Sequence, residues 1–182
     1  MIRPYRGRRP RLSTGVWIDP SAQVVGDVEL GADASVWPLV AIRGDVNAVR
    51  IGARTNVQDL SVLHVTHDGP YSPGGVPLVI GDDVTIGHHV VLHACTIGSR
   101  VLVGMGAIVM DRVVIEDDVL VAAGSVVPPG KHLHSGWLYR GAPAQPARAL
   151  TAAEREQLLY SARHYVRLKN QYLEDARDGA VS

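Results

Sequence analysis

A six-residue repeat is the feature that most constrains how this chain folds. Between Ile18 and Val127, an aliphatic side chain recurs at every sixth position in four runs. The repeated residues are Ile18, Val24, Leu30, Val36 and Ile42; Ile51, Val57 and Leu63; Ile80, Ile86 and Leu92; and Ile97, Val103, Val109, Ile115, Val121 and Val127. A short fixed period of this kind is the sequence signature of a solenoid.

The repeat also predicts how each turn is built. One hexapeptide supplies one short strand and one corner, so about three hexapeptides, or about 18 residues, complete a triangular turn. Val and Ile suit the inward position because they pack well on a pleated surface, and the glycine that often follows permits corners that a Cβ would obstruct. Stacked turns would bury a continuous aliphatic core, which explains a hydrophobic content of 46% in a chain without Phe. An ordinary β-sandwich is the alternative, and the sustained period of six disfavours it, so we expect an all-β solenoid.

The first departure from the repeat is the segment from Thr66 to Pro77. It contains three prolines and three glycines and cannot continue the strands. We therefore expect a loop, 66–77, that leaves the solenoid shortly after His64. Its role is either that of a plain turn or that of the border of a functional site.

The second departure is at the C-terminus, where Thr151 and Glu154 form a capping-box pattern. Together with helically spaced apolar residues, this pattern predicts a helix from about Ala152 to Asp175. We expect one solenoid domain over residues 1–148, with an N-terminal lead-in and the proline-rich loop. Residues 149–182 would add a C-terminal helix, packed on the solenoid of its own or a neighbouring subunit.

The cysteine content and the distribution of apolar residues indicate the cellular compartment. The single cysteine, Cys95, can form no intrachain disulfide, which fits a reducing compartment. The arginine-rich start from Met1 to Leu12 lacks the apolar run of a secretory signal, and no segment is long and apolar enough to span a membrane. We therefore expect a cytoplasmic protein without a membrane partner.

A basic cluster near the N-terminus raises the question of nucleic-acid binding. It consists of Arg3, Arg6, Arg8, Arg9 and Arg11. Arginines can contact phosphates, but 18 basic and 18 acidic side chains cancel over the whole chain and offer no broad basic face. Pro4 and Pro10 favour instead an extended lead-in packed against the first turn or a neighbouring chain, so no nucleic-acid partner is expected.

Three histidines inside the repeat, His64, His88 and His93, have the composition of a metal site. A catalytic zinc ion commonly takes three protein ligands and keeps a fourth position for water, and neutral histidine is a common donor. Each histidine taken alone is more often a structural residue. His64 and His93 directly follow inward leucines, so we expect both to point outward from neighbouring turns. His88 lies two positions after Ile86 and should point elsewhere, which suits a ligand from an adjacent subunit around a threefold axis.

Polar residues precede His64 where a purely structural solenoid has little need of them, in Arg43-Gly44-Asp45 and Asn56-Val57-Gln58-Asp59. Gln58 is suited to hydrogen-bond a reacting water or a substrate. Arg43 is suited to pair with Asp45 or Asp59, within one chain or across subunits, in the two-pronged geometry that guanidinium favours. A network that only holds subunits together is an equally open role, and the two roles are compatible.

With these motifs the chain closely resembles the gamma-class carbonic anhydrase family, in particular its bacterial branch of short hexapeptide-repeat proteins. The resemblance covers nearly the whole chain. Its motifs are Arg43-Gly44-Asp45, Asn56-Val57-Gln58-Asp59, Leu63-His64-Val65-Thr66-His67, Ile86-Gly87-His88-His89-Val90-Val91-Leu92-His93, Val103-Gly104-Met105-Gly106 and Gly141-Ala142-Pro143. The five-residue spacing of His88 and His93 after a distant His64 is the most specific of them. The resemblance implies a left-handed parallel β-helix of hexapeptide repeats with a C-terminal α-helix.

The resemblance also implies a homotrimer with three metal sites, each between two subunits. The ligands of Zn²⁺ or Fe²⁺ would be His64 and His93 of one chain and His88 of the next. Gln58 would assist the reacting water, while Tyr160 on the helix would reach the site. The supporting interface network would consist of Arg43, Asp45 and Asp59.

The reaction implied is the reversible hydration of carbon dioxide to bicarbonate, for which the metal would lower the pKa of a bound water to about 7. The best-known active members of the family carry acidic proton-shuttle residues after the Arg-x-Asp motif and in the loop after the first ligand. Here Val46 occupies the first of these positions, and Asp68 is the only acid in the loop. His67, His89 or buffer would then have to carry the proton.

Two other functions remain open. Many hexapeptide-repeat proteins are acyltransferases that use coenzyme A or a similar thioester with one histidine as general base, and this chemistry needs no cluster of three histidines. A non-catalytic role, in metal or bicarbonate binding or in an assembly, would retain the metal without turnover. The remaining histidines fit no ligand position of the matched motif and are not assigned as ligands: His67, His89, His132, His134 and His164.

Overall fold

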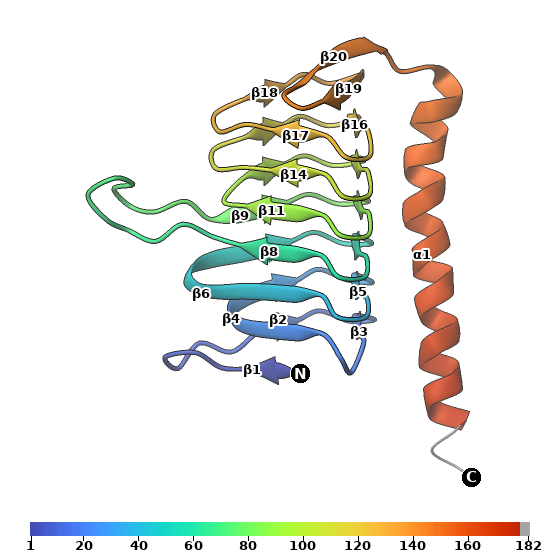
Figure 1. Cartoon of the computed structure of the whole chain (residues 1–182). Helices are drawn as coiled ribbons and strands as arrows, with labels where there is room; N and C mark the ends of the chain where they lie inside the picture. The colour runs from blue at the N-terminus through green and yellow to red at the C-terminus, as the bar shows by residue number, and fades with distance from the viewer. Residues whose placement is uncertain (179–182) are drawn as a thin grey trace.

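Most strands of this chain are two or three residues long, because each hexapeptide contributes only one short extended segment before the chain turns. The computed structural model describes residues 1–178, so the last four residues of the predicted C-terminal segment, 179–182, lie outside the described residues. The predicted fold class is confirmed, since the structure is a parallel β-solenoid of about eight turns followed by a single C-terminal helix (Figure 1).

The strands form two sheets. The first contains β1 (Ile2–Arg3), β2 (Arg11–Leu12), β4 (Gln23–Leu30), β6 (Ala41–Ile51), β8 (Val62–His64), β9 (Leu78–Ile80), β11 (Val91–His93), β12 (Thr96–Ile97), β14 (Ile108–Val109), β15 (Val114–Ile115), β17 (Val126–Val127) and β18 (His132–Leu133). The second contains β3 (Trp17–Ile18), β5 (Ser35–Val36), β7 (Asn56–Val57), β10 (Thr85–Ile86), β13 (Leu102–Val103), β16 (Leu120–Val121), β19 (Trp137–Gly141) and β20 (Ala144–Ala149). Neighbouring strands pair in parallel except β19 and β20, which close the C-terminal end as an antiparallel pair.

The register places the inward residue of each turn over the inward residue of the next. Leu63 of β8 pairs with Leu92 of β11, and Val57 of β7 pairs with Ile86 of β10. All four side chains are fully buried in one continuous aliphatic core. The period of six therefore identifies the inward positions correctly.

Glycine follows many inward residues because consecutive turns approach one another closely there. A Cβ on Gly52 would lie 2.4 Å from the carbonyl carbon of Gly81 on the next turn. A Cβ on Gly87 would lie 2.8 Å from the amide nitrogen of Met105. Corners with a left-handed backbone are instead often taken by other residues, as at His89, where φ is 59°. Gly52 and Gly87 therefore permit a close stacking of turns that a Cβ would obstruct.

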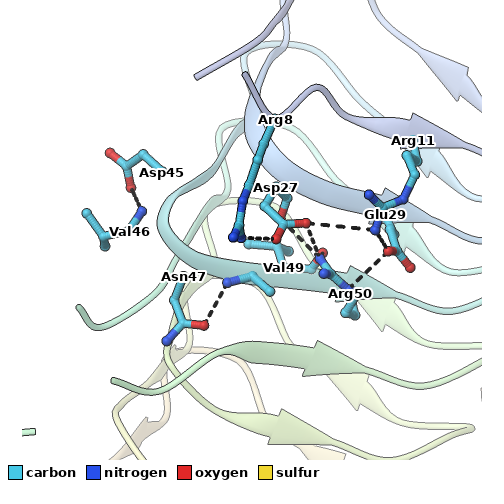
Figure 2. Close-up of polar contacts among 10 residues, drawn as sticks. Arg8, Arg11, Asp27, Glu29, Asp45, Val46, Asn47, Val49 and Arg50 are labelled. Carbon is cyan, nitrogen blue, oxygen red and sulfur yellow. Dashed lines mark hydrogen bonds and ion pairs between the residues drawn. The ribbon is translucent and has the colours of Figure 1, made fainter. Parts of the chain in front are cut away.

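An ion-pair network ties the N-terminal lead-in to the solenoid (Figure 2). Arg8 Nη1 lies 2.7 Å from Asp27 Oδ2, and Arg50 Nη1 lies 2.9 Å from Asp27 Oδ1. Arg11 and Arg50 both pair with Glu29. Burial raises the pKa of Asp27, but the hydrogen bonds and charges of Arg50 and Arg8 outweigh it and hold the pKa below its ordinary value. Two of the N-terminal arginines thus hold the lead-in against the first turns, as predicted.

The proline-rich loop leaves the solenoid between β8 and β9, as predicted, and projects away from it (Figure 1). Reciprocal backbone hydrogen bonds between Thr66 and Val76, at 3.0 and 2.9 Å, close its base. Because Thr66 comes two residues after His64, the base of the loop adjoins the predicted metal site.

Helix α1 (Ala152–Asp178) begins at the predicted capping box. Thr151 N donates to Glu154 Oε2 at 2.9 Å, and Glu154 N donates to Thr151 Oγ1 at 3.2 Å. These bonds satisfy amides that the first turn of a helix leaves without intrahelical partners. From this start the helix runs back along the solenoid (Figure 1).

The helix packs on the second sheet of its own chain, over β5, β7 and β10. Leu158 and Ala162 are buried, as the helical spacing predicted. Trp37 meets Tyr165 edge-on, with ring centroids 5.3 Å apart, and the buried Lys169 Nζ lies 2.7 Å from Asp33 Oδ1. Within this one chain the helix lies on its own solenoid, which is one of the two predicted positions. No helix within residues 1–178 is long and apolar enough to cross a membrane.

Candidate metal centre

The solenoid brings His64 and His93 side by side. They are paired residues of the neighbouring parallel strands β8 and β11, and each follows an inward leucine, so both side chains point outward. Nδ1 of His64 lies 3.2 Å from Nε2 of His93. Two donors of one tetrahedral ion, at a bond length of about 2.0–2.1 Å, lie about 3.3 Å apart. The predicted common direction of these two histidines is confirmed, and their spacing fits two ligands of one ion.

In each of the two rings, the other nitrogen contacts the carboxylate of an aspartate. Nε2 of His64 lies 3.1 Å from Asp45 Oδ1, and Nδ1 of His93 lies 2.9 Å from Asp111 Oδ2. A carboxylate accepts a hydrogen bond, so it favours the tautomer with the proton on the nitrogen that faces it. The nitrogens that face each other are then both unprotonated, with two lone pairs directed at one small space. This donor set fits a divalent cation.

Burial and charge keep these groups in the states that a metal site needs. The pKa of His64 is lowered by burial first and by the nearby Arg43 and His93, while Asp45 opposes the shift. Burial raises the pKa of Asp45, but hydrogen bonds from Arg43 and His64 lower it more, so the net shift is downward. The histidine is therefore neutral and the carboxylate ionised near neutral pH, as metal ligation requires.

His88 lies at a different place on the same chain. It follows β10 at a corner, and its Nδ1 lies 2.9 Å from Asp59 Oδ2. Among the described residues, one group of three or more His, Cys, Asp or Glu has donor atoms within 4.8 Å of one another, and it does not include His88. His88 thus has a carboxylate partner of its own, as each of the other two histidines has, but it does not join them within one chain. A shared site between subunits would require this separation.

The predicted contacts of Arg43, Asp59 and Gln58 are found only in part. Arg43 Nη1 lies 2.6 Å from Asp45 Oδ2, so the predicted pairing of Arg43 takes its Asp45 alternative within the chain. Asp59 pairs with His88 instead. Gln58 is buried and donates from Nε2 to Asn56 Oδ1 at 3.0 Å.

Gln58 and His88 line a groove of about 430 Å³ between the second sheet and helix α1. Most of its other lining is apolar, from Val103, Met105 and their neighbours. From the helix, Tyr165 lines the groove, and its pKa is raised by burial and by the charge of Asp59.

Tyr160 is not among the residues that line this groove. It is 62% exposed, stacks on His164 with ring centroids 6.2 Å apart, and lies under the guanidinium of Arg167. Its role at the site stays a prediction.

Asp111 is the site residue that the sequence motifs did not reveal. Besides meeting His93, it accepts a hydrogen bond from Thr66 Oγ1 at the base of the loop. The available signal was its distance from His93, because 18 residues correspond to one full turn. A carboxylate one turn beyond a candidate ligand is therefore the pattern to look for.

The chain matches known proteins over most of its length. Residues 22–173 match the family described as dynactin subunit 5. Protein YrdA of Escherichia coli K12 is 55% identical over 174 residues, which cover 96% of this chain and 95% of YrdA. A carbonic anhydrase of Geobacillus kaustophilus is 40% identical over 172 residues, covering 94% of this chain and 90% of the relative. Gamma carbonic anhydrase 2, mitochondrial, of Arabidopsis thaliana is 40% identical over 161 residues, covering 88% of this chain and 58% of the relative.

A solved structure agrees with these sequence matches. The hexapeptide transferase family protein of Anaplasma phagocytophilum superposes with a TM-score of 0.86 at 40% identity, over 94% of this chain and 97% of the other. The solenoid and these matches define a hexapeptide-repeat protein. Within that class, the chain belongs to the gamma-class carbonic anhydrase family, which confirms the predicted resemblance. Membership supports a carbonic-anhydrase-like, metal-dependent function.

Proposed function

We propose that the protein is a metal-dependent carbonic anhydrase, a lyase that catalyses the reversible hydration of carbon dioxide to bicarbonate. Zn²⁺ or Fe²⁺ would be held between two subunits of a homotrimer, by His64 and His93 of one chain and His88 of the next. The observation that carries this proposal is the pair of facing imidazole nitrogens, 3.2 Å apart, on rings whose other nitrogens both meet carboxylates.

The bound ion would supply a water of lowered pKa that can attack carbon dioxide near neutral pH. Asp45 and Asp111 hold the two imidazoles in the ligating tautomer, and Arg43 keeps Asp45 ionised. Asp59 does the same for His88 through the 2.9 Å contact to Nδ1, which leaves Nε2 of His88 for the ion. All three proposed ligands thus have the carboxylate support that is usual for metal-binding histidines.

Gln58 would position the reacting molecules. Its Nε2 is committed to Asn56, so its Oε1 remains to accept a hydrogen bond from the attacking water. The groove beside it is largely apolar, which suits carbon dioxide, a small molecule without net charge. Tyr160, exposed in the single chain, is proposed to reach the site from the helix.

The proton released in the reaction needs a carrier. Asp68, the one acid of the loop, accepts a hydrogen bond from Gly74 N at 2.7 Å and so helps to hold the loop in shape. Val46 cannot carry a proton. We therefore propose that His67, His89 or buffer takes the proton away from the site.

A second candidate function follows from the name of the matched family, because dynactin subunit 5 is named as a subunit of an assembly. The protein would then keep the metal or bicarbonate without turnover. An acyltransferase role is the third candidate, since the matched Anaplasma protein is named a hexapeptide transferase. The carboxylates that contact all three histidines favour metal binding over a single general base.

We also propose a cytoplasmic location, which fits the buried, unpaired Cys95.

The deciding experiment is stopped-flow hydration of carbon dioxide by anaerobically iron-loaded, zinc-loaded and chelator-stripped protein at matched concentration. We expect turnover that depends on the metal and disappears in His93→Ala. Glu156→Ala, which changes an exposed side chain near the start of helix α1, is the control and should keep full activity. Bound metal without turnover would favour the assembly role, and binding of acetyl-coenzyme A would favour the acyltransferase role.

A further inference from the structure

The last turn of the solenoid carries a second cluster of metal-binding side chains. Strand β18 pairs in parallel with β15, so that Leu133 lies over Ile115. Leu133 is buried, and it continues the six-residue period one step beyond Val127. Because Leu133 points inward, its two neighbours His132 and His134 project outward. Glu116 follows Ile115 on the turn below and faces them.

The three side chains converge on one point. Nε2 of His132 lies 2.8 Å from Glu116 Oε1, and Nδ1 of His134 lies 3.4 Å from the same oxygen. The two imidazoles stack with centroids 4.7 Å apart, and one donor atom from each of the three residues lies within 4.8 Å of the others. Donors of one ion lie about 3.3 Å apart in a tetrahedron and about 2.9 Å apart in an octahedron, at bond lengths of about 2.0–2.1 Å. The two histidine–glutamate distances are close to these values, so the three side chains could share an ion that replaces the protons now facing Glu116 Oε1.

The backbone of the last turn holds this cluster in place. Ser135 N donates to Glu116 Oε2 at 2.8 Å, which leaves Oε1 for the imidazoles. His134 N donates to the hydroxyl of the buried Tyr139 at 2.8 Å. The positions of the ligands are therefore fixed by contacts that do not involve the donor atoms themselves.

The cluster is separate from the proposed metal centre. In the first sheet, β8 and β11 lie on one side of the long strand β6, whereas β15 and β18 lie on the other. The two groups thus occupy different faces of the solenoid. Their metal occupancies can be measured independently.

We propose that Glu116, His132 and His134 form a second binding site, for a divalent transition-metal ion such as Zn²⁺. Two imidazoles and one carboxylate with open positions are a donor set that such ions accept. Because β18 is the end strand of its sheet, an ion held here would tie the last turn to the turn before it. We propose that this site is structural. The last turn of a solenoid has a stacking neighbour on one side only, and a bound ion would add to its stability.

The test is a zinc titration of chelator-stripped protein, with bound metal counted by mass spectrometry after desalting. We expect the double variant His132→Asn/His134→Asn to lose about one zinc ion per chain relative to the unchanged protein. His93→Ala, which alters the proposed first centre, should keep that ion. His164→Asn, an exposed histidine on the helix, is the matched control and should lose none. Equal zinc content in the double variant and the unchanged protein would overturn the proposal.

Two further measurements guard against a variant that is merely misfolded. Glu116→Gln keeps the shape of the side chain and an oxygen for Ser135 N, and it should weaken zinc binding at this site at least tenfold. Excess zinc should also raise the melting temperature of His93→Ala but not that of the same variant carrying His132→Asn/His134→Asn. If Glu116→Gln binds zinc as tightly as the unchanged chain, or if zinc raises both melting temperatures equally, the proposed site is wrong.

Discussion

Replacing Asp111 by asparagine would test whether a carboxylate outside the ligand set controls the proposed metal centre. Asp111 touches His93 through Oδ2 and Thr66 through Oδ1. Burial raises its pKa, but hydrogen bonds from Thr66 and His93 outweigh burial and keep the group ionised near neutral pH. Asparagine has nearly the same shape, so it can keep the Thr66 contact and leave the loop in place. It removes the charge, and its amide can donate to His93 Nδ1.

The expected loss of metal affinity follows from the change in the tautomer of His93. If the asparagine amide donates to Nδ1, the proton of His93 moves to Nε2, the nitrogen that should bind the metal. Loss of such a carboxylate partner typically weakens metal affinity by about 10–100-fold, which corresponds to about 1.4–2.7 kcal/mol. We expect Asp111→Asn to fall in this range, with little change in folding.

Zinc affinity would be measured by competition with a fluorescent chelator, together with the melting temperature. Asp27→Asn is the matched control, because Asp27 is also an ionised, partly buried aspartate, but it pairs with arginines on another part of the solenoid. It should change stability without changing zinc affinity. An Asp111→Asn protein that folds normally and binds zinc as tightly as the unchanged chain would refute the role given to this carboxylate.

Three other substitutions address the ligands, the core and the helix. His93→Ala should abolish tight metal binding at the proposed first centre, so that metal content falls by about one ion per chain while the proposed trimer stays folded, as judged by metal analysis and light scattering; unchanged metal content would rule out His93 as a ligand. Leu92→Ala should lower the free energy of unfolding in urea by about 2–5 kcal/mol, because Leu92 is fully buried, whereas the exposed Leu39→Ala should change it by about 0.5 kcal/mol or less. Hydrogen bonds from Arg148 and Thr151 lower the pKa of Glu154 to about 2, below its ordinary 4.5, so its capping contribution is complete above pH 4.5 and is lost as the pH falls towards 2. The melting temperature of the unchanged chain should therefore converge with that of Glu154→Gln over this range, and a constant difference between the two would contradict the capping role.

The sequence predicted the parts of the site that depend on the period alone. His64 and His93 each follow an inward leucine, so their common direction follows from the alternation of side chains along a strand. The intervening loop does not disturb this relation, because β8 and β11 still pair in register on either side of it. The capping box of Thr151 and Glu154 was also predictable from the sequence, because its two residues are only three positions apart.

Contacts across one turn were harder to predict. Asp111 meets His93 and Thr66 because the base of the loop and two successive turns meet at one corner. The sequence gives their spacing but not the direction in which each corner side chain points.

The cluster around Glu116 was missed for a different reason. The six-residue pattern is hard to recognise in the sequence after Val127, although Leu133 continues it. Pro128, Pro129 and Gly130 lie between these two residues and obscure the pattern. Without the phase of Leu133, His132 and His134 could not be assigned a common direction.

The division of the histidines within one chain has a consequence for how the protein would be handled. His64 and His93 meet on one side of the solenoid, while His88 does not join them. Under the proposed sharing between subunits, metal binding and subunit association are linked, and each must strengthen the other by the same factor. Metal retention should then fall on dilution, and a chelator should release subunits as well as ions. Metal content measured in dilute samples would underestimate the occupancy of the protein at its working concentration.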